Sequence, residues 1–353
     1  MSTQQQALQR SPLHRSDTSD PLEHRNPPSI YFCDGDDRSE PRSRHSLPPE
    51  TKLAVRALHV LDPRWNWVIV LYYTLWLVSA WIAVHSGSFL VRLAMALTGG
   101  LVLSTLSVLA HEASHNLFTH RASVDQWFGF FAGLPVLFSS AGYRVMHPLH
   151  HKYLRSERDP DDIENITRNS RLLRVVYIFV FVAAVYLYLV TVPVNGYRNG
   201  TREERRAILL ELGGMVLVLG AAWTLLPVTV LVVGWVLPLL VAGQIANIRG
   251  LAEHGLTATG NELINARTVT STPVLSFLMC NINYHLEHHL YPGVPWYNLP
   301  RLHELLQREE ERAGASVYRG YGAFLRDVAR VLLHGVTPGR RLIPAHIREH
   351  VCV

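Results

Sequence analysis

Eight histidines lie in three short clusters, and each cluster adjoins an apolar stretch of the chain. The clusters read HEASH, HPLHH and HLEHH, and their histidines are His111, His115, His147, His150, His151, His285, His288 and His289. Imidazole nitrogens are frequent ligands of iron, zinc and copper. Because polar side chains beside a lipid bilayer are costly unless they serve a function, the clusters predict a metal centre at a membrane.

The spacing inside each cluster is three or four residues, which places the rings on one face of a helix. Three short helical segments would therefore direct eight imidazoles toward one interior site. A tetrahedral zinc ion takes about four ligands, so eight are too many for one such ion. The set suits two metal ions that are held mainly by imidazole.

The segments HEASH, HPLHHKY and NYHLEHHLYP resemble the three histidine boxes of the membrane fatty acid desaturases, and we refer to them as boxes one, two and three. Related lipid hydroxylases and carotenoid ketolases share the pattern. The likeness runs over residues 111–300. It implies two iron ions without haem, O₂ as co-substrate, and removal of hydrogen from an unactivated C–H bond of a lipid.

The resemblance also implies a ninth metal ligand between boxes two and three. His254, in RGLAEHG, stands at the matching place. Familiar members of the family carry an asparagine four residues before this histidine. This chain has Gly250 there, so no ligand is expected at that position.

The segment NYHLEHHLYPGVPWYNLPRLH is most similar to the acyl desaturases, which favours desaturation of a fatty acyl chain. Hydroxylation of a lipid, or hydroxylation or ketolation of a carotenoid, is the alternative within the same superfamily. HEASH also matches the HExxH motif of zinc proteases, with Glu112 as general base. That remote alternative, a membrane zinc protease, leaves boxes two and three unexplained.

The electrons for such a reaction must come from a separate carrier. The sequence has no GxGxxG dinucleotide motif and no HPGG haem motif, so no fused reductase or cytochrome domain is visible. A ferredoxin or a cytochrome b5-type protein is the expected donor. Lys152, Arg155, Arg158 and Arg301 offer a basic surface for an acidic partner. We expect no nucleic-acid partner, because basic residues are not interleaved with aromatic ones.

The composition, with 48% hydrophobic residues and a net charge of +5, favours an all-α integral membrane protein. Residues 67–84 and 89–110 are long enough to cross a bilayer, whereas 127–138 is too short and is expected to lie at the interface. The long apolar stretch 208–246 breaks at Leu226-Pro227 and predicts two further spans.

Residues 172–194 are also long enough to span. If they did, box three would lie across the membrane from boxes one and two, and one site would not form. We therefore interpret 172–194 as re-entrant or interfacial. The alternative is that 208–246 crosses the membrane only once and contains a re-entrant part. About four transmembrane helices then carry a histidine-rich cap, and the basic loop 198–206 places it on the cytoplasmic side.

Three parts of the chain follow from this interpretation. Residues 1–56 are expected to form a disordered polar tail. Residues 57–305 form the membrane domain that resembles the desaturases, with the lipid substrate bound among its helices. Residues 306–353 form a cytoplasmic amphipathic tail.

Overall fold

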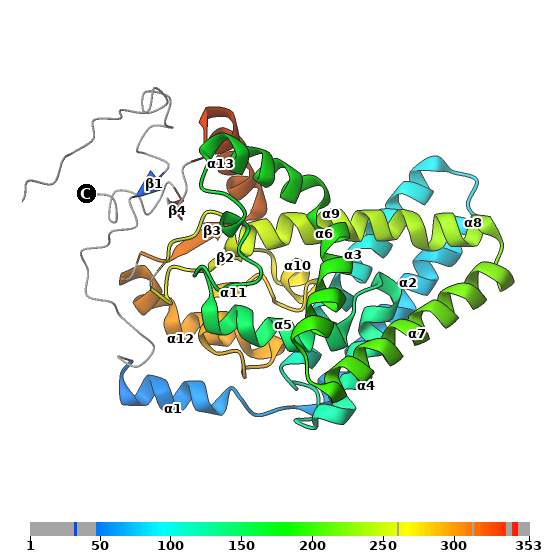
Figure 1. Ribbon diagram of the computed structural model, residues 1–353, viewed down its shortest axis with the longest axis horizontal. Helices are drawn as coiled ribbons and strands as arrows, with labels where there is room; N and C mark the ends of the chain where they lie inside the picture. Colours follow the sequence, from blue (N-terminus) through cyan, green and yellow to red (C-terminus); the bar gives the residue numbers. More distant parts are fainter. Residues whose placement is uncertain (1–31, 34–46, 260, 313, 337–340, 345–353) are drawn as a thin grey trace, which may run out of the picture.

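The protein is described here from a computed structural model, which covers residues 32–33, 47–259, 261–312, 314–336 and 341–344 and is mainly helical (Figure 1). Five helical segments in the described part are long and apolar enough to cross a membrane. They are Pro63–His85, which contains α2 (Val68–His85), α3 (Phe89–Ser114), α6 (Ser170–Asn199), α7 (Arg202–Leu225) and Val228–His254. This confirms the predicted helical membrane fold, with one more candidate span than expected.

The last of these segments consists of α8 (Val228–Leu231), one π-helical turn and α9 (Leu237–His254). A break at Leu226-Pro227 separates it from α7, as the sequence predicted, because proline disfavours a helical backbone at the preceding residue and Leu226 is extended. In Figure 1, helices α2, α3, α7 and α9 extend toward the same side of the molecule. A Cβ on Gly100 of α3 would lie 2.4 Å from Val241, so glycine permits the close approach of α3 to α9.

The additional candidate span is α6, which runs across these four helices rather than alongside them (Figure 1). It is one continuous helix of 30 residues, so it does not turn back as a re-entrant segment would. On α9, Gln244 donates to the Phe181 carbonyl and Asn247 accepts from the Val185 N–H. In a regular helix, the Phe181 carbonyl and the Val185 N–H would bond to each other. Side chains of α9 that insert between such groups bend the helix. The interfacial position of α6 stays a prediction, since its length and hydropathy also suit a span.

Boxes two and three and their surroundings lie on shorter elements at one end of the long helices. These are α4 (Ala122–Gly133), α5 (Ser140–Tyr153), α10 (Pro273–Leu278), α11 (His285–Leu290), α12 (Leu299–Arg312) and α13 (Tyr321–His334). Strand β2 (Arg267–Thr270) pairs in parallel with β3 (Ser316–Arg319), and β1 (Phe32–Cys33) pairs antiparallel with β4 (Arg341–Leu342). The apolar segment 127–138 is mostly α4 and is too short to span, as expected.

The expected disordered tail needs a correction at its end. Residues 49–56 belong to a helix, α1 (Pro49–Ala57), because Val55 and Leu58 are buried in a cluster with Leu299 and Leu302 of α12. The rest of the expected tail lies outside the described residues, apart from 32–33 and 47–48. The boundary expected at residue 305 falls inside α12.

Candidate metal centre

All nine histidines expected as ligands meet at one place in the structure. Box one lies at the end of α3, box two on α5, box three on α11, and His254 is the last residue of α9. The rings form two groups. The five-histidine group contains His111, His115, His147, His151 and His288. The four-histidine group contains His150, His254, His289 and, in contact with them, His285.

The nitrogen atoms that face each other have the spacing of ligands around one ion. In the five-histidine group, Nε2 of His147 lies 2.9 Å from Nε2 of both His115 and His151. In the four-histidine group, Nε2 of His285 lies 2.8 Å from that of His254 and 3.0 Å from that of His289. Two imidazoles bound at about 2.1 Å and at right angles would lie about 3 Å apart. The residues therefore fit a metal in each group.

Unpaired nitrogens give independent support for this fit. Both ring nitrogens of His111 and of His288 are buried and have no hydrogen-bond partner in the described part of the chain. A buried polar atom without a partner is unfavourable, and such atoms are uncommon in native proteins. A metal ion between these rings would satisfy them.

Most histidines of the boxes are held in the neutral form that binds metals. Burial lowers the pKa of His115 to about 3 and that of His151 to about 2, and nearby cationic groups add to the effect. Burial likewise lowers the pKa of His147, His288 and His289. A neutral imidazole has a free lone pair, so metal binding at neutral pH displaces few protons.

His150 differs because a carboxylate faces its outer nitrogen. Burial opposes its protonation, but the hydrogen bond to Asp159, with Nδ1 and Oδ1 2.8 Å apart, and the charge of Asp161 raise its pKa. Asp159 also accepts from the backbone N–H of Arg155 and of Asp161, which fixes its position. Such a pair orients the imidazole and increases its basicity as a ligand.

Three other acidic residues of the described structure lie near the rings without a hydrogen bond to them. Glu253 Oε1 is 3.7 Å from Nδ1 of His285, and Asp161 Oδ2 is 3.9 Å from Nδ1 of His150. Glu112 Oε1 lies 3.4 Å from Nδ1 of His111, while its Oε2 accepts the backbone N–H of Trp296. Glu112 thus ties box one to the segment after box three, which the sequence did not indicate.

Box two is positioned by a buried carboxylate of α7. Glu211 accepts from the hydroxyl of Ser139 at 2.6 Å and from the backbone N–H groups of Ser140 and Ala141. These groups begin α5, whose first N–H groups have no partner within the helix. In the sequence Glu211 was only an unusual acid at the edge of a span; its role depends on the packing of α7 against α5.

His254 is positioned by a buried arginine of β2. The Arg267 guanidinium donates to the carbonyls of Ala252, Gly255 and Leu256, at the carboxyl end of α9. A cation at this end of a helix satisfies carbonyls that have no partner within it. Nothing in the sequence around Arg267 indicated this contact.

Box three is fixed through Glu287, which is fully buried between Thr268 of β2 and His303 of α12. His303 also lies 3.1 Å from Glu310. Burial alone would lower the pKa of His303, but the two carboxylates raise it to about 10. His303 therefore supports box three, although it lies on a different helix, α12.

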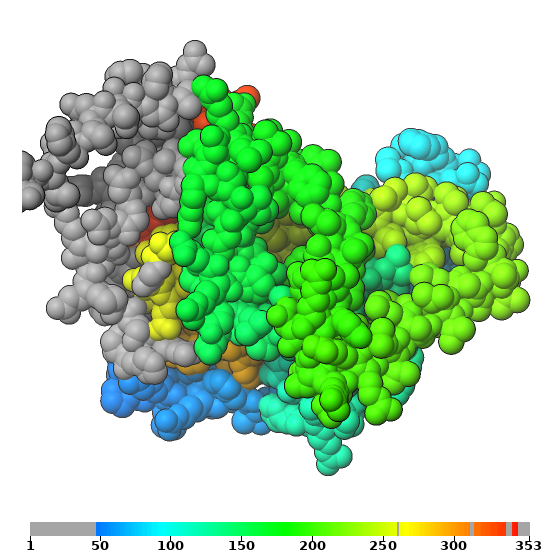
Figure 2. Space-filling view, viewed as in Figure 1, coloured from blue at the N-terminus to red at the C-terminus, as the bar shows by residue number. Residues whose placement is uncertain are grey.

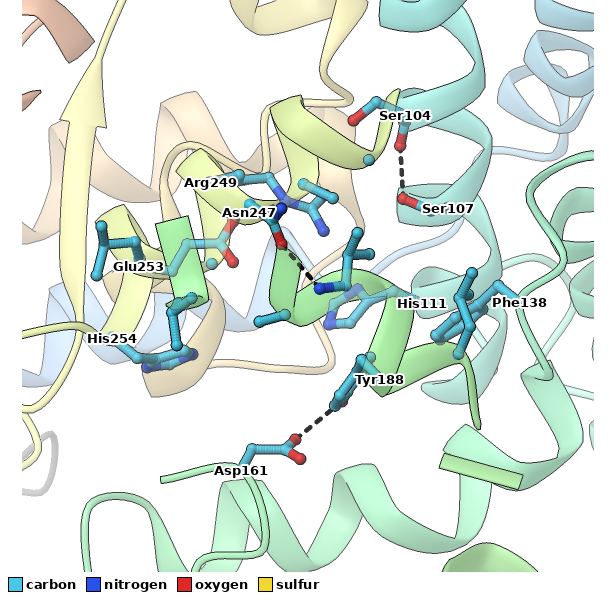
Figure 3. Close-up of a pocket in the computed structure, with 18 of the residues that line it drawn as sticks. Ser104, Ser107, His111, Phe138, Asp161, Tyr188, Asn247, Arg249, Glu253 and His254 are labelled. Carbon is cyan, nitrogen blue, oxygen red and sulfur yellow. Dashed lines mark hydrogen bonds and ion pairs between the residues drawn. The ribbon is translucent and has the colours of Figure 1, made fainter. Parts of the chain in front are cut away.

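Two cavities reach the histidines. One of about 360 Å³ lies among α3, α5, α6 and α9, and His111, His147 and His254 form part of its wall (Figure 3). Figure 2 shows a hollow in the surface beside α6, which forms one wall of this cavity. The other, of about 390 Å³, is lined by His115, His151 and His289 together with Lys152 and Glu262. The centre is thus reached from two sides.

The expected basic docking surface needs a correction. Arg155 is buried, with 5% of its surface exposed, and forms ion pairs with Asp162 and Glu164. It therefore supports the loop after box two and offers no charge to a partner. Lys152 and Arg158 lie over the ring of Tyr153.

Comparison with known proteins agrees with this geometry. The family model described as fatty acid desaturase matches residues 87–321. The sphingolipid delta(4)-desaturase/C4-monooxygenase DES2 of Homo sapiens is 29% identical over 266 residues, which cover 71% of this chain and 77% of that protein. The sn-1 oleoyl-lipid 12-desaturase of Arthrospira platensis is 23% identical over 256 residues, covering 66% and 73%. A fatty acid desaturase of Bacillus subtilis (strain 168) is 26% identical over 249 residues, covering 62% and 68%.

Proposed function

Because the chain belongs to the fatty acid desaturase family, we propose that its nine clustered histidines hold two iron ions, one in each group. The protein is a multi-pass membrane oxidoreductase that acts on lipids. The observation that carries the proposal is the meeting of two imidazole groups beside a cavity lined largely by apolar side chains. The zinc-protease interpretation of HEASH is at odds with this family.

Two iron ions bound there would supply the O₂ activation that attack on an unactivated C–H bond requires. The residues of the chain supply placement and protection. Neutral imidazoles offer lone pairs, and Asp159 orients the ring of His150. The walls of the cavity hold one part of a lipid chain against His111, His147 and His254, and such positioning accounts for much of the rate gained at enzyme sites.

Desaturation is the proposed outcome, with introduction of a double bond into a fatty acyl or related lipid chain. Hydroxylation is the second candidate, since the printed name of the human relative includes both a desaturase and a monooxygenase. Removal of two hydrogens from adjacent carbons gives the double bond, whereas insertion of one oxygen gives an alcohol. Both outcomes are compatible with the same nine ligands.

Electrons would come from a separate ferredoxin or cytochrome b5-type carrier. The second cavity supports this, because it brings His115, His151 and His289 within reach of the face that carries Lys152. We place this face, and the histidine boxes, on the cytoplasmic side. The support is the basic loop at 198–206, which follows the preference of positive charge for that side.

The test compares the wild type with His288→Ala in a lipid-rich host, with extracted lipids measured by mass spectrometry. The wild type should give species lighter by two hydrogens, and His288→Ala should give none, because the lost ligand opens the coordination sphere at the centre even where the iron of the five-histidine group is retained. His85→Ala, at an exposed position at the end of α2, is the matched control and should behave as the wild type.

Products heavier by one oxygen would instead favour the hydroxylase. Near-normal turnover by His288→Ala would contradict the di-iron site with this ligand set. Iron analysis of the purified proteins gives a second readout, with about two ions per chain expected in the wild type.

A further inference from the structure

The cavity beside the histidines has two chemically different parts. Its apolar part is formed by Val136, Leu137, Phe138, Leu239 and Ala242. Its polar part is formed by Asn247 and Arg249 of α9, with Glu253 and Asp161 (Figure 3). A cavity that takes only hydrocarbon would leave the unpaired polar atoms of this part, those of Asn247, Arg249 and Glu253, without hydrogen-bond partners, at a cost in free energy.

Asn247 presents a free donor to this cavity. Only 4% of its surface is exposed. Its Oδ1 accepts from the Val185 N–H of α6 at 2.8 Å, which fixes the orientation of the amide. Its Nδ2 is buried and has no hydrogen-bond partner among the described residues. The amide is thus oriented, desolvated and unpaired on its donor side.

Arg249 presents further donors close to the metal centre. Its Nε lies 3.3 Å from Oε1 of Glu253, and the same carboxylate oxygen lies 3.7 Å from Nδ1 of His285. Its Nη1 is buried and has no hydrogen-bond partner in the part of the chain that the structure describes. One carboxylate therefore separates Arg249 from an expected ligand, and Figure 3 shows its side chain directed into the cavity near His111.

The charges around the cavity favour a neutral ligand. Asp159, Asp161 and Glu253 line it, whereas its other cation, Arg155, is held by Asp162 and Glu164. A phosphate or carboxylate beside Arg249 would also face these acids, and like charges repel. Hydroxyl and amide groups suit the site better, because they accept from Asn247 and Arg249 and donate to the carboxylates.

We propose that Asn247 and Arg249 bind the polar head of the substrate lipid, a neutral head that carries hydroxyl and amide groups, and that the oxidised carbons lie within the first few carbons of this head. The proposal rests on the proposed function. Because the polar part of the cavity adjoins His285 and His254, a head bound there holds the start of the chain beside the centre. The remainder of the chain extends into the apolar part.

A binding experiment tests the head group without requiring turnover. Purified full-length protein in detergent is titrated with three probes of similar chain length: N-hexanoyl sphinganine, hexadecyl acetate and hexadecyl phosphate. We expect the sphinganine amide to bind at least about tenfold more tightly than the other two. Arg249→Met and Asn247→Leu should each remove about tenfold of that preference. Equal binding of the three probes, or tighter binding of the phosphate, overturns the proposal.

Two control variants separate head-group binding from general effects. Gln244→Met removes the neighbouring hydrogen bond to α6, but Gln244 does not line the cavity. It should keep the preference, whereas a loss equal to that of Asn247→Leu would show that Asn247 acts by shaping α6. Gly220→Leu places a side chain into open space on α7 and should bind as the wild type.

Mapping of the double bond in the wild-type product tests the second half of the proposal. Unsaturation close to the polar head supports it, and unsaturation in the middle of the chain overturns it while leaving the lipid desaturase intact. Probe binding with the expected preference, but no oxidised lipid from iron-loaded protein supplied with reductant, would instead contradict the proposed function.

Discussion

The two histidine groups use different means to hold a metal. The five-histidine group has more imidazoles, but in the described structure none of its Nδ1 atoms has a hydrogen-bonded carboxylate; Glu112 lies 3.4 Å from His111 without a hydrogen bond. The four-histidine group has fewer imidazoles and has Asp159 on His150, with Glu253 near His285. The five-histidine group thus relies on a larger number of ligands, and the four-histidine group relies on nearby carboxylates. The two groups can therefore bind a metal comparably well.

Loss of one ligand should therefore affect the two groups unequally. His254→Ala leaves three imidazoles in the four-histidine group and should remove about one iron per chain. Activity should fall by more than the roughly 100-fold that follows mutation of a residue that only supports a ligand. His151→Ala leaves four imidazoles in its group and should retain most of its iron. Metal analysis and turnover of the purified variants measure both effects. Equal iron loss in the two variants would contradict the difference between the groups.

Loss of a supporting carboxylate should sharpen the same contrast. Asp159→Asn removes the charged acceptor of His150. It should lower the affinity of the four-histidine group for iron by about 10- to 100-fold. Glu112→Gln, beside the five-histidine group, is the matched change and should have a smaller effect because no hydrogen bond to His111 is lost. The measurement is the amount of iron that a competing chelator removes from each variant, which identifies the more weakly bound ion. A larger effect of Glu112→Gln would reverse the assignment of roles.

Glu211 offers a change that should weaken both groups together, because box two contributes to each. Glu211→Leu leaves the hydroxyl and N–H groups at the start of α5 without an acceptor, at a cost of about 1–3 kcal/mol. Thermal unfolding in detergent should show a lower Tm, with parallel loss of both ions. Glu203→Leu, at an exposed position in the first turn of α7, is the control. Selective loss of one ion would contradict this prediction.

The smallest effect is expected at His303, outside both groups. Against the opposing effect of burial, Glu287 and Glu310 raise the pKa of His303 to about 10. The stability that His303 adds is full below its ordinary pKa of about 6.5 and is lost as pH rises toward 10.

The Tm of the wild type should therefore exceed that of His303→Gln by a margin that shrinks between about pH 6.5 and 10. The measurement is thermal unfolding of both proteins across this range. A margin that grows with pH would show that His303 is not held protonated by the two carboxylates.

The sequence by itself determined the family and indicated the candidate ligands. Spacings of three and four residues indicated rings on shared helix faces, and the similarity of the three boxes indicated the family that the comparisons bear out. Leu226-Pro227 indicated the turn between α7 and α8, since proline restricts the backbone locally. These are properties of neighbouring residues, so no knowledge of the packing was needed. For 172–194, length and hydropathy alone did not separate a span from a helix at the interface.

Only the tertiary structure decided how the rings are shared. The pairs His111–His115 and His147–His151 belong to one group, and His285–His289 belongs to the other, each at i and i+4. The remaining rings cross over: His150 joins His254, and His288 joins His111. Adjacent helical residues point in different directions, so which group each joins depends on where α3, α5, α9 and α11 lie. The contacts of Glu211, Arg267 and His303 likewise join segments distant in sequence, and packing alone brings them together.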